Sequence, residues 1–490
     1  MVTSTMNILL VQHNGVLGGV NSNTRSGAFE PLALEYLASS AELLGHNVRV
    51  ELIGSDIDEF RDLLSCMKPD VVGFSVYSYA MEDSVALSQI VKKEYGNHWK
   101  RPITIFGGAH PTTCPEEIVC HESVDFVVIG EGEETFCCLL EAIENNRNYN
   151  DVEGIAFVQK GKCIITPRRK RIENPDFLPY PKREERHLSQ SKQYKIVYPP
   201  PSQQRSVASV LYSRGCPFSC SFCASESIWS KRVFWRDPEE VCNELEELIR
   251  LHGTNLVFFS DLTFNANKSK VLEFCRVLAS RDLPLHWWGM FRLDLVDEEM
   301  LDSLVEAKCM KLSFGIESPI ESRAKRIKDH YDPNEVRQRE ILGYANELGL
   351  VLRAFLIIGF PDDTEESILT YSQHMHDLGV DEIRLGFATP FPGTRFFEEA
   401  KQSGLLPDKI DWSAMTTEAP YLNHPILSKQ QLLKLQKEII LQFYMSRRYL
   451  EHVVDKTTRF PKLKQPWVEY LEFLSSNGVF RDRETDYTVL

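Results

Sequence analysis

The sequence predicts an α/β protein in three parts: a doubly wound parallel sheet, a partial barrel of six βα units, and a helical C-terminal region. Two observations predict this architecture. Short apolar runs alternate with helical patterns along most of the 490 residues, and such alternation is typical of parallel βαβ units. It stops once, in a proline-rich stretch at about 150–205, so the units fall into two groups that we interpret as separate domains.

Residues 1–148 make up the first group, which we expect to be a Rossmann-like, doubly wound domain. Its predicted strands are short apolar runs at 7–11, 48–53, 71–76, 103–106 and 126–129. A loop rich in Gly and Asn covers 13–27, Gly107 and Gly108 follow the fourth strand, and Gly130 follows the fifth. Because ligands of such sheets bind at the carboxyl ends of the strands, we expect a binding site along this edge.

Residues 149–205 are predicted to be a linker between the two domains. Prolines recur through this stretch, up to the run at 199–201, and interrupt every regular pattern. Two short apolar runs, 155–158 and 163–166, indicate a small hairpin. We interpret the basic run at 168–171 as a solvated stretch rather than a nucleic-acid patch.

Residues 206–400 resume the alternation and are predicted to form the partial barrel. The expected strands lie at 208–213, 255–260, 285–290, 311–314, 353–358 and 382–387. Six units within about 190 residues fall short of the eight that close a complete barrel. Residues 401–490 are predicted to be helical, with one long amphipathic helix at 428–449.

Composition and charge restrict the classes of partner. A net charge of -15 argues against a nucleic-acid partner, because binding to phosphates needs a basic surface. No apolar run reaches the roughly 18–20 residues of a membrane span, and residues 1–10 lack the pattern of a signal peptide. We therefore expect a cytoplasmic protein without a membrane span, whose twelve cysteines stay reduced.

Three of these cysteines have the spacing of metal ligands. Cys216, Cys220 and Cys223 follow the strand expected at 208–213, so three thiolates share one short loop. Iron–sulfur clusters are held by cysteine thiolates, usually four, and a set of three leaves one iron open to another ligand. A structural zinc site is the alternative, but it needs a fourth Cys or His at short range, and the next cysteine is Cys242. Three buried core cysteines are a further alternative.

The C-x3-C-x2-C spacing, with Phe222 before the last cysteine, resembles the signature of the radical S-adenosylmethionine (SAM) superfamily. The resemblance implies a [4Fe-4S] cluster whose open iron binds the amino and carboxylate groups of SAM. Reduction of that cluster by an external electron donor, such as flavodoxin or ferredoxin, then gives a 5′-deoxyadenosyl radical. The substrate is expected to be a small molecule.

Further segments resemble the SAM-binding parts of that superfamily. Glu317 and Ser318 end the fourth barrel strand, where a polar residue approaches the methionyl or ribose part of SAM. Gly359 begins the turn beside the adenine, and Ser260 and Asp261 end the second strand, where the SAM amino group is received. The last pair departs from the common Gly-Gly-Glu form.

The first domain resembles the cobalamin-binding modules that precede the radical domain in one subgroup. The resemblance assigns cobalamin contacts to residues at strand ends: Ser75, Gly107, Gly108, His110, Thr112, Gly130, Glu131 and Gly132. The Asp-x-His-x-x-Gly segment that supplies an axial His to cobalt is missing, and we expect His110, which precedes a proline, to bond locally. The subgroup often lacks this His, so cobalamin is still expected; a module that has lost the cofactor is the alternative.

These resemblances predict a cobalamin-dependent methyltransferase that acts on an unactivated carbon, with its pocket in the cleft between the domains. The alternative on the same scaffold is a cobalamin-associated ring cyclase of the bacteriochlorophyll type, or a dehydratase or carbon–carbon coupling enzyme that need not bind cobalamin. A non-catalytic cobalamin sensor or carrier is a third possibility, although a carrier has no use for an open iron.

Overall fold

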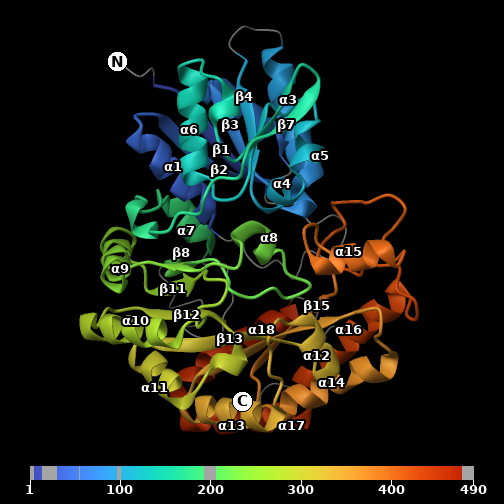
Figure 1. The fold of residues 1–490 in the computed structure, drawn as a ribbon. Helices are drawn as coiled ribbons and strands as arrows, with labels where there is room; N and C mark the ends of the chain where they lie inside the picture. The colour runs from blue at the N-terminus through green and yellow to red at the C-terminus, as the bar shows by residue number, and fades with distance from the viewer. Residues whose placement is uncertain (1–4, 14–29, 55, 97–100, 192–205, 477–490) are drawn as a thin grey trace.

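Two large sheets, one above the other in Figure 1, organise the computed structural model of the protein. It describes residues 5–13, 30–54, 56–96, 101–191 and 206–476. The N-terminal sheet lies at the top of the view and the barrel below it. The loop expected at 13–27 falls, apart from its first residue, outside the described residues.

The first sheet has the strand order β2-β1-β3-β4-β5-β6-β7. Its strands are β1 (Asn7–His13), β2 (Asn47–Ile53), β3 (Val71–Ser75), β4 (Ile103–Gly107), β5 (Phe126–Val128), β6 (Ile155–Gln159) and β7 (Lys162–Ile165). The first five strands in chain order pair in parallel. The predicted hairpin is β6 and β7, which extends the edge of this sheet in antiparallel pairing rather than standing alone in a linker.

Helices cover both faces of the first sheet, as the doubly wound prediction requires. One apolar layer joins the sheet to α1 (Leu32–Leu43) and α6 (Glu133–Glu144). The opposite layer joins it to α2 (Ile57–Met67), α3 (Met81–Tyr95) and α5 (Pro115–Val119). The short α4 (Ala109–Thr113) follows β4. This arrangement leaves the carboxyl ends of β3, β4 and β5 directed at the second domain (Figure 1).

The second sheet is the predicted partial barrel of six parallel strands in the order β15-β14-β13-β12-β11-β8. The strands are β8 (Val207–Val210), β11 (Leu256–Phe259), β12 (His286–Phe291), β13 (Cys309–Glu317), β14 (Val351–Ile358) and β15 (Glu382–Phe387). Its helices are α9 (Pro238–His252), α10 (Lys268–Arg281), α11 (Glu298–Glu306), α12 (Glu321–Ile327), α13 (Glu335–Glu347), α14 (Glu365–Asp377) and α15 (Arg395–Gln402).

The first barrel strand differs from the prediction of one strand at 208–213. Strand β8 ends at Val210, and a separate strand, β9 (Ser213–Arg214), pairs antiparallel with β10 (Phe234–Trp235). The chain leaves the sheet because the carboxylate of Asp261 accepts the backbone N–H groups of both Tyr212 and Ser213.

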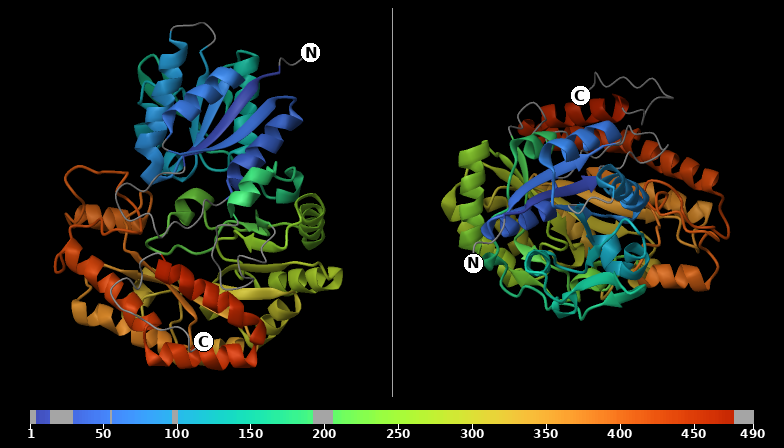
Figure 2. Two further views of the ribbon diagram at one scale, coloured as in Figure 1. Left: turned by 180° about the vertical axis from the view of Figure 1, so that it is seen from behind. Right: turned by 90° about the horizontal axis from the view of Figure 1, so that it is seen from above.

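The helix predicted at 428–449 is two helices, and this part of the prediction was wrong. Helix α16 (Lys429–Tyr444) ends before Ser446, which accepts the backbone N–H of Tyr449 at 3.0 Å and so begins α17 (Arg447–Arg459). Helix α18 (Lys464–Ser476) follows. Seen from behind in Figure 2, these red C-terminal helices lie against the barrel. No helix within the described residues is long and apolar enough to cross a membrane.

The segment after β15 returns to the N-terminal domain. Trp412, Met415 and Tyr421 belong to the same buried apolar cluster as residues of β3 and α3. The indole N–H of Trp412 also donates to Glu117 at 2.7 Å. The two domains are therefore in contact through this segment as well as through the chain that links β7 to β8.

Candidate functional site

The loop of the three cysteines begins immediately after β9. Gly215 precedes Cys216 with a φ of 111°, and a Cβ at this position would lie 2.1 Å from the carbonyl oxygen of Arg232. Only glycine fits there, because other residues avoid this φ and would clash. Cys216 is buried, and Cys220 and Cys223 are half-buried. The backbone therefore turns sharply just before the first expected cluster ligand.

The residues after α12 hold this loop from one side. The N–H of Ser221 donates to the carbonyl of Ile327 at 2.7 Å, and the N–H of Ser219 donates to the carboxylate of Asp329 at 3.0 Å. Lys328 stands between Ile327 and Asp329 in the chain and donates from Nζ to the carbonyl of Gly315 at 2.6 Å. The same segment therefore shapes the loop and brings a buried cation to it.

A second cation lies against the loop. The guanidinium carbon of Arg292 is 3.8 Å from the ring centre of Phe218, and Arg292 also pairs with Asp294 at 2.8 Å. Burial raises the pKa of the Cys220 thiol, while Lys328 and Arg292 oppose that rise. Both cations favour negative charge on the loop, as thiolate ligands require. Nη1 of Arg292 is buried and has no hydrogen-bond partner among the described residues.

This donor set fits an iron–sulfur cluster. Within the described residues, no three His, Cys, Asp or Glu side chains are close enough to hold one metal ion. In a cluster each cysteine binds a different iron, so the thiols need not converge on one point. Cys216, Cys220 and Cys223 offer three thiols on one eight-residue loop beside two cations, which is the chemistry that an anionic cluster needs.

Asp261 holds the strand that leads into the cysteine loop. Its carboxylate is 1% exposed and accepts the N–H groups of Tyr212 at 3.0 Å and Ser213 at 2.6 Å. Burial raises its pKa to about 6, against the opposing effect of these hydrogen bonds. Its neighbour Ser260 donates its N–H to the carbonyl of Val210. Both residues thus lie at the end of β11 beside the loop, and their contact with SAM stays a prediction.

Glu317 has an unusual backbone at the end of β13. Its φ is 63°, and the pairing register with β14 shifts between Gly315 and Glu317. A Cβ on Gly315 would lie 1.9 Å from Glu317 Oε1, so the Glu317 side chain folds back over this glycine. Burial raises the Glu317 pKa to about 7, and the charge of Lys328 opposes the rise. A buried carboxyl group thus lies at the end of β13, within the electrostatic influence of Lys328.

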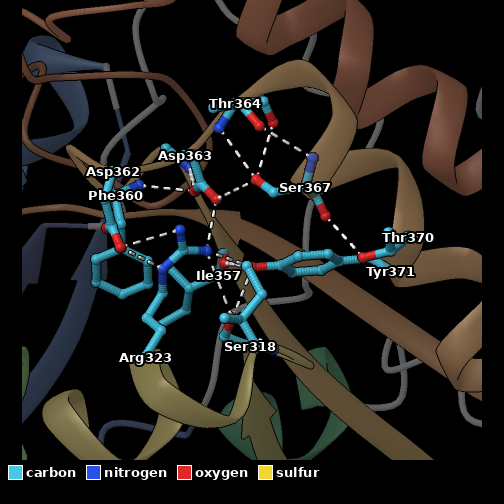
Figure 3. A network of polar contacts seen from close by, with 12 residues as sticks. Ser318, Arg323, Ile357, Phe360, Asp362, Asp363, Thr364, Ser367, Thr370 and Tyr371 are labelled. Carbon is cyan, nitrogen blue, oxygen red and sulfur yellow. Dashed lines mark hydrogen bonds and ion pairs between the residues drawn. The ribbon is translucent and has the colours of Figure 1, made fainter.

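Figure 3 shows a polar network that joins the two segments expected to contact SAM. The carboxylate of Asp363 accepts the N–H groups of Gly359 at 2.8 Å and Phe360 at 2.9 Å. Its other oxygen accepts from Arg323 at 2.5 Å. The hydroxyl of Tyr371 lies 3.2 Å from Ser318 Oγ. The network thereby connects the end of β13 with the turn after β14.

Sequence reasoning missed Arg323, Asp363 and Tyr371. The available signal was the position of Asp363 just before a capped helix: it is followed by Thr364, whose side chain caps α14. The sequence carried no sign of Arg323 or Tyr371, because they meet Asp363 only through the packing of α12 and α14.

The residues expected to contact cobalamin gather at three strand ends. Gly108 has a φ of 105°, and a Cβ there would lie 2.9 Å from the nitrogen of Val76 and 3.5 Å from Ser75 Oγ. Thr112 Oγ1 accepts the N–H of Gly130 at 3.1 Å. The structure therefore brings Ser75, Gly107, Gly108, Thr112 and Gly130 together, and glycine at 108 lets the backbone approach closely.

His110 is buried beneath the returning C-terminal segment. It is 1% exposed, its Nδ1 lies 3.0 Å from Ser78 Oγ, and its ring centre lies 4.6 Å from that of Trp412, with the two rings at 73°. Burial lowers its pKa to about 4, so the imidazole is neutral at pH 7. Its Nε2 has no hydrogen-bond partner in the part of the chain that the structure describes. The hydrogen bond of His110 is thus not local in sequence as we expected, but joins it to Ser78, 32 positions away.

The carboxylate of Glu131 pairs with the segment that follows β7 and lies 3.7 Å from Arg214, just before the cysteine loop. Its carboxylate accepts from Nε of Arg171 at 2.6 Å and from the N–H of Ile172 at 3.0 Å. At Gly132, a Cβ would lie 3.1 Å from the side chain of Leu37, so this glycine allows close packing on α1. These contacts give Glu131 a bond between domains; its contact with cobalamin stays a prediction.

The basic run at 168–171 is only partly solvated: Arg168 is exposed, whereas the side chain of Arg171 is buried, and for Arg171 this interpretation was wrong. Arg168 donates to the carbonyl of Ser227 at 2.7 Å, and Arg171 donates to that of Trp229 at 2.6 Å. These carbonyls belong to the short helix α8 (Ser225–Trp229), which follows the cysteine loop. Cationic side chains satisfy free carbonyls at the end of a helix, so the run fastens α8 to the first domain.

Comparison with known proteins gives two family matches. A model described as a B12 binding domain matches residues 19–140, and a model of the radical SAM superfamily matches residues 210–374. The chain is 30% identical over 430 residues to an uncharacterized methyltransferase of Pyrococcus horikoshii, covering 86% of this chain and 89% of that protein. It is 25% identical over 465 residues to the anaerobic magnesium-protoporphyrin IX monomethyl ester cyclase of Rubrivivax gelatinosus. That match covers 92% of this chain and 80% of the cyclase.

Solved structures show the same fold. The radical SAM methyltransferase TsrM of Kitasatospora setae, with cobalamin and a [4Fe-4S] cluster bound, superposes with a TM-score of 0.64. The match covers 83% of this chain and 80% of TsrM at 18% sequence identity. The two domains found here, and their order along the chain, are thus those of a known two-domain architecture.

Proposed function

The chain belongs to the cobalamin-dependent radical SAM enzymes, and from this membership we propose that it is a methyltransferase acting on an unactivated carbon of a small molecule. The observation that carries the proposal is the meeting of two loops. Nη1 of Arg214, two residues before Cys216, lies 2.6 Å from the carboxylate of Glu133, which follows the strand-end glycines of the B12 domain. A methyl donor and a radical source must both reach one substrate, and this junction brings their expected sites together.

Each cofactor has a set of residues that would hold it. Cys216, Cys220 and Cys223 would hold the [4Fe-4S] cluster, and the ends of β11, β13 and β14 would contact SAM. The cobalamin contacts would come from Ser75, Gly108, Thr112 and Gly130. When bound, the cluster supplies the electron that cleaves SAM to a radical, and cobalamin carries the methyl group.

The protein residues prepare this site in three ways. Lys328 and Arg292 offset negative charge on the cysteine loop. Asp363 fixes the turn at Gly359 by accepting two backbone N–H groups. His110 stays neutral in its buried position, so it adds no charge to the strand ends. The electron is proposed to come from an external protein of the flavodoxin or ferredoxin class.

A cyclase reaction is the second candidate. The observation that favours it is the relation to the magnesium-protoporphyrin ester cyclase over 92% of this chain. Both reactions begin with the same radical, so the two differ in whether a methyl group reaches the product.

The test uses full-length protein, purified without oxygen and reconstituted with iron, sulfide and hydroxocobalamin. It is given SAM with an isotopically labelled methyl group, titanium citrate as reductant, and fractions of a small-molecule extract from its source cells. We expect the visible spectrum of bound corrin, release of 5′-deoxyadenosine, and labelled methyl in one product. Cys220→Ala, the matched control, should bind cobalamin and release no 5′-deoxyadenosine. Product formation by protein that holds no cobalamin would contradict the methyltransferase, and a product that carries no labelled methyl would favour the second candidate.

A further inference from the structure

Four charged side chains form a buried network between the two domains. Arg214 pairs with Glu133 at 2.6 Å and lies 3.7 Å from Glu131. Arg171 pairs with Glu131 at 2.6 Å. Each of these four side chains is only 5–8% exposed. We define these residues as the junction network.

The junction network is connected directly to both expected cofactor loops. On one side, Glu131 and Glu133 follow Gly130, whose N–H donates to Thr112 in α4, the helix that follows β4. On the other side, Arg171 donates from Nη2 to the carbonyl of Arg214 at 3.2 Å, next to Gly215, which precedes Cys216.

Arg171 also binds the backbone that follows the cysteine loop in the chain. Its Nη1 donates to the carbonyls of Trp229 at 2.6 Å and Arg232 at 3.1 Å. Its guanidinium lies 4.8 Å from the ring centre of Trp229. One side chain thus contacts Glu131 in the first domain and the backbone on both sides of the cysteine loop.

The burial of these charges makes the geometry difficult to change. The two arginines and two glutamates balance in charge, but each would be left as an unpaired buried ion if the loops moved apart, and such ions are strongly unfavourable. The planar guanidinium of an arginine also fixes the direction of its hydrogen bonds to a carboxylate, which the ammonium group of a lysine does not. Arg214 is held in addition by the ring of Tyr36, 4.6 Å from its guanidinium carbon. The network therefore has one favourable arrangement.

We propose that the junction network sets the position of the cysteine loop relative to the cobalamin loops, and so makes cluster binding and cobalamin binding cooperative. Arg214, Arg171, Glu131 and Glu133 are positioning residues in this proposal. It rests on the proposed function, because it takes the strand-end loops to be the cobalamin site. A cluster that orders the loop after Gly215 would order Glu133 and Gly130 through Arg214, and cobalamin would do the reverse, since coupling between two sites is reciprocal.

The experiment measures cobalamin affinity with and without the cluster. Hydroxocobalamin is titrated, by its visible spectrum, into full-length protein that is either cluster-free or cluster-reconstituted. We expect the cluster to tighten cobalamin binding of the natural protein about fivefold or more. In Glu133→Gln, which keeps the size of the side chain, the ratio should fall towards one although both cofactors still bind. Arg214→Lys keeps the positive charge but loses the planar guanidinium, so it should also lower the ratio below that of the natural protein.

The matched control is Arg281→Met. Arg281 also pairs with two glutamates, Glu239 at 2.6 Å and Glu246 at 2.7 Å, but it joins α9 and α10 within the barrel domain. This variant should keep the natural ratio. If Arg214→Lys does not fold, Glu133→Gln decides the question, and the electron paramagnetic resonance spectrum of its reduced cluster reports whether the loop is formed.

Three results would overturn the proposal. The natural protein could bind cobalamin equally well with and without the cluster, or Glu133→Gln could retain the full ratio. In both cases the junction network is only a structural contact and the proposed function is untouched. If the natural protein binds no cobalamin at all, the proposed function fails with it, and release of 5′-deoxyadenosine then shows whether the radical reaction remains.

Discussion

The two ends of the barrel both contain buried charges, but they use them differently. At the amino ends of the strands, Lys456 is fully buried and donates to Asn346 and to the carbonyl of Leu350, each at 2.6 Å, and to Asp381. Asp381 accepts in addition the N–H of Leu352 at 2.7 Å and pairs with His452 at 2.7 Å. Every charge in this group is paired, and these pairs hold α17 against the amino ends of the barrel strands.

The carboxyl ends, which face the B12 domain, are less complete. Nε2 of His110, Oε1 of Glu131 and Nη1 of Arg292 are buried, and none has a hydrogen-bond partner in the described part of the chain. The amino ends have one such atom, Oε1 of Glu382, whose carboxylate still pairs with Lys311 at 2.6 Å. The comparison teaches that the network at the amino ends serves the fold, whereas His110 and Arg292 each keep a buried polar atom that is free to bind another group beside the expected cofactor loops.

The largest effect should come from breaking the completed end. Lys456→Met leaves Asp381 as a buried carboxylate without its principal cation, and loss of one partner of a buried pair costs about 3–5 kcal/mol of unfolding free energy. Urea denaturation followed by tryptophan fluorescence measures this loss. Folded Lys456→Met should still accept the cluster, because the cysteine loop lies at the other end.

The control for this variant lies on the same helix. Arg447 is exposed and pairs with Glu451 one turn away, so Arg447→Met should leave the denaturation midpoint unchanged. Lys456→Met with the stability of the natural protein would show that hydrophobic packing alone closes the barrel.

The next effect concerns His110 at the open end and depends on pH. The pKa of His110 is lowered by burial from its ordinary 6.5 to about 4. Between these values the unfolded chain binds a proton that the folded chain does not, so acid favours unfolding. The stabilisation is complete above pH 6.5 and is lost as the pH falls to about 4. About 2.5 pKa units correspond to about 3 kcal/mol.

Denaturation curves at several pH values between 4 and 7 measure this effect. His110→Gln, which stays neutral throughout, should flatten the dependence in that window, although its absolute stability is lower because Gln cannot reproduce the packing on Trp412. An unchanged slope in His110→Gln would mean that other groups cause the acid sensitivity. Cobalamin that lowers the pKa further would identify His110 as part of its site.

The sequence was sufficient to predict most of the fold and the cysteine loop, for local reasons. Strand and helix periodicity extends over a few residues, and the three cysteines stand within eight positions of one another. The break at Ser446 was also local, since a serine cap was present in the sequence, but the apolar pattern continued across it and gave no sign of an end.

The junction network could not be predicted, because its partners are distant in the chain. Glu133 and Arg214 are 81 positions apart, and Glu131 and Arg171 are 40 apart. A basic run normally indicates a solvated stretch, and only the packing of the first domain on α8 gives Arg168 and Arg171 their carbonyl partners. Long-range polar pairing of this kind is decided by tertiary structure.

The smallest expected effect concerns the Asp363 network at the carboxyl ends of the barrel strands. It tests whether this network stabilises the fold or the binding of SAM. Asp363→Asn keeps an acceptor for the N–H groups of Gly359 and Phe360 but turns an amide towards Arg323, whose guanidinium loses its closest carboxylate (Figure 3). A buried hydrogen bond to a charged group contributes about 1.5–3 kcal/mol, so we expect about a tenfold or greater loss of SAM affinity, measured by equilibrium dialysis on the cluster-reconstituted protein.

Asp362→Asn is the control, since Asp362 is exposed and pairs with the same arginine at 3.3 Å. Reduced stability with natural SAM affinity would assign the network to the fold, as at the amino ends. Reduced affinity with little loss of stability would assign it to the turn that receives SAM, because Asp363 acts through the backbone of Gly359.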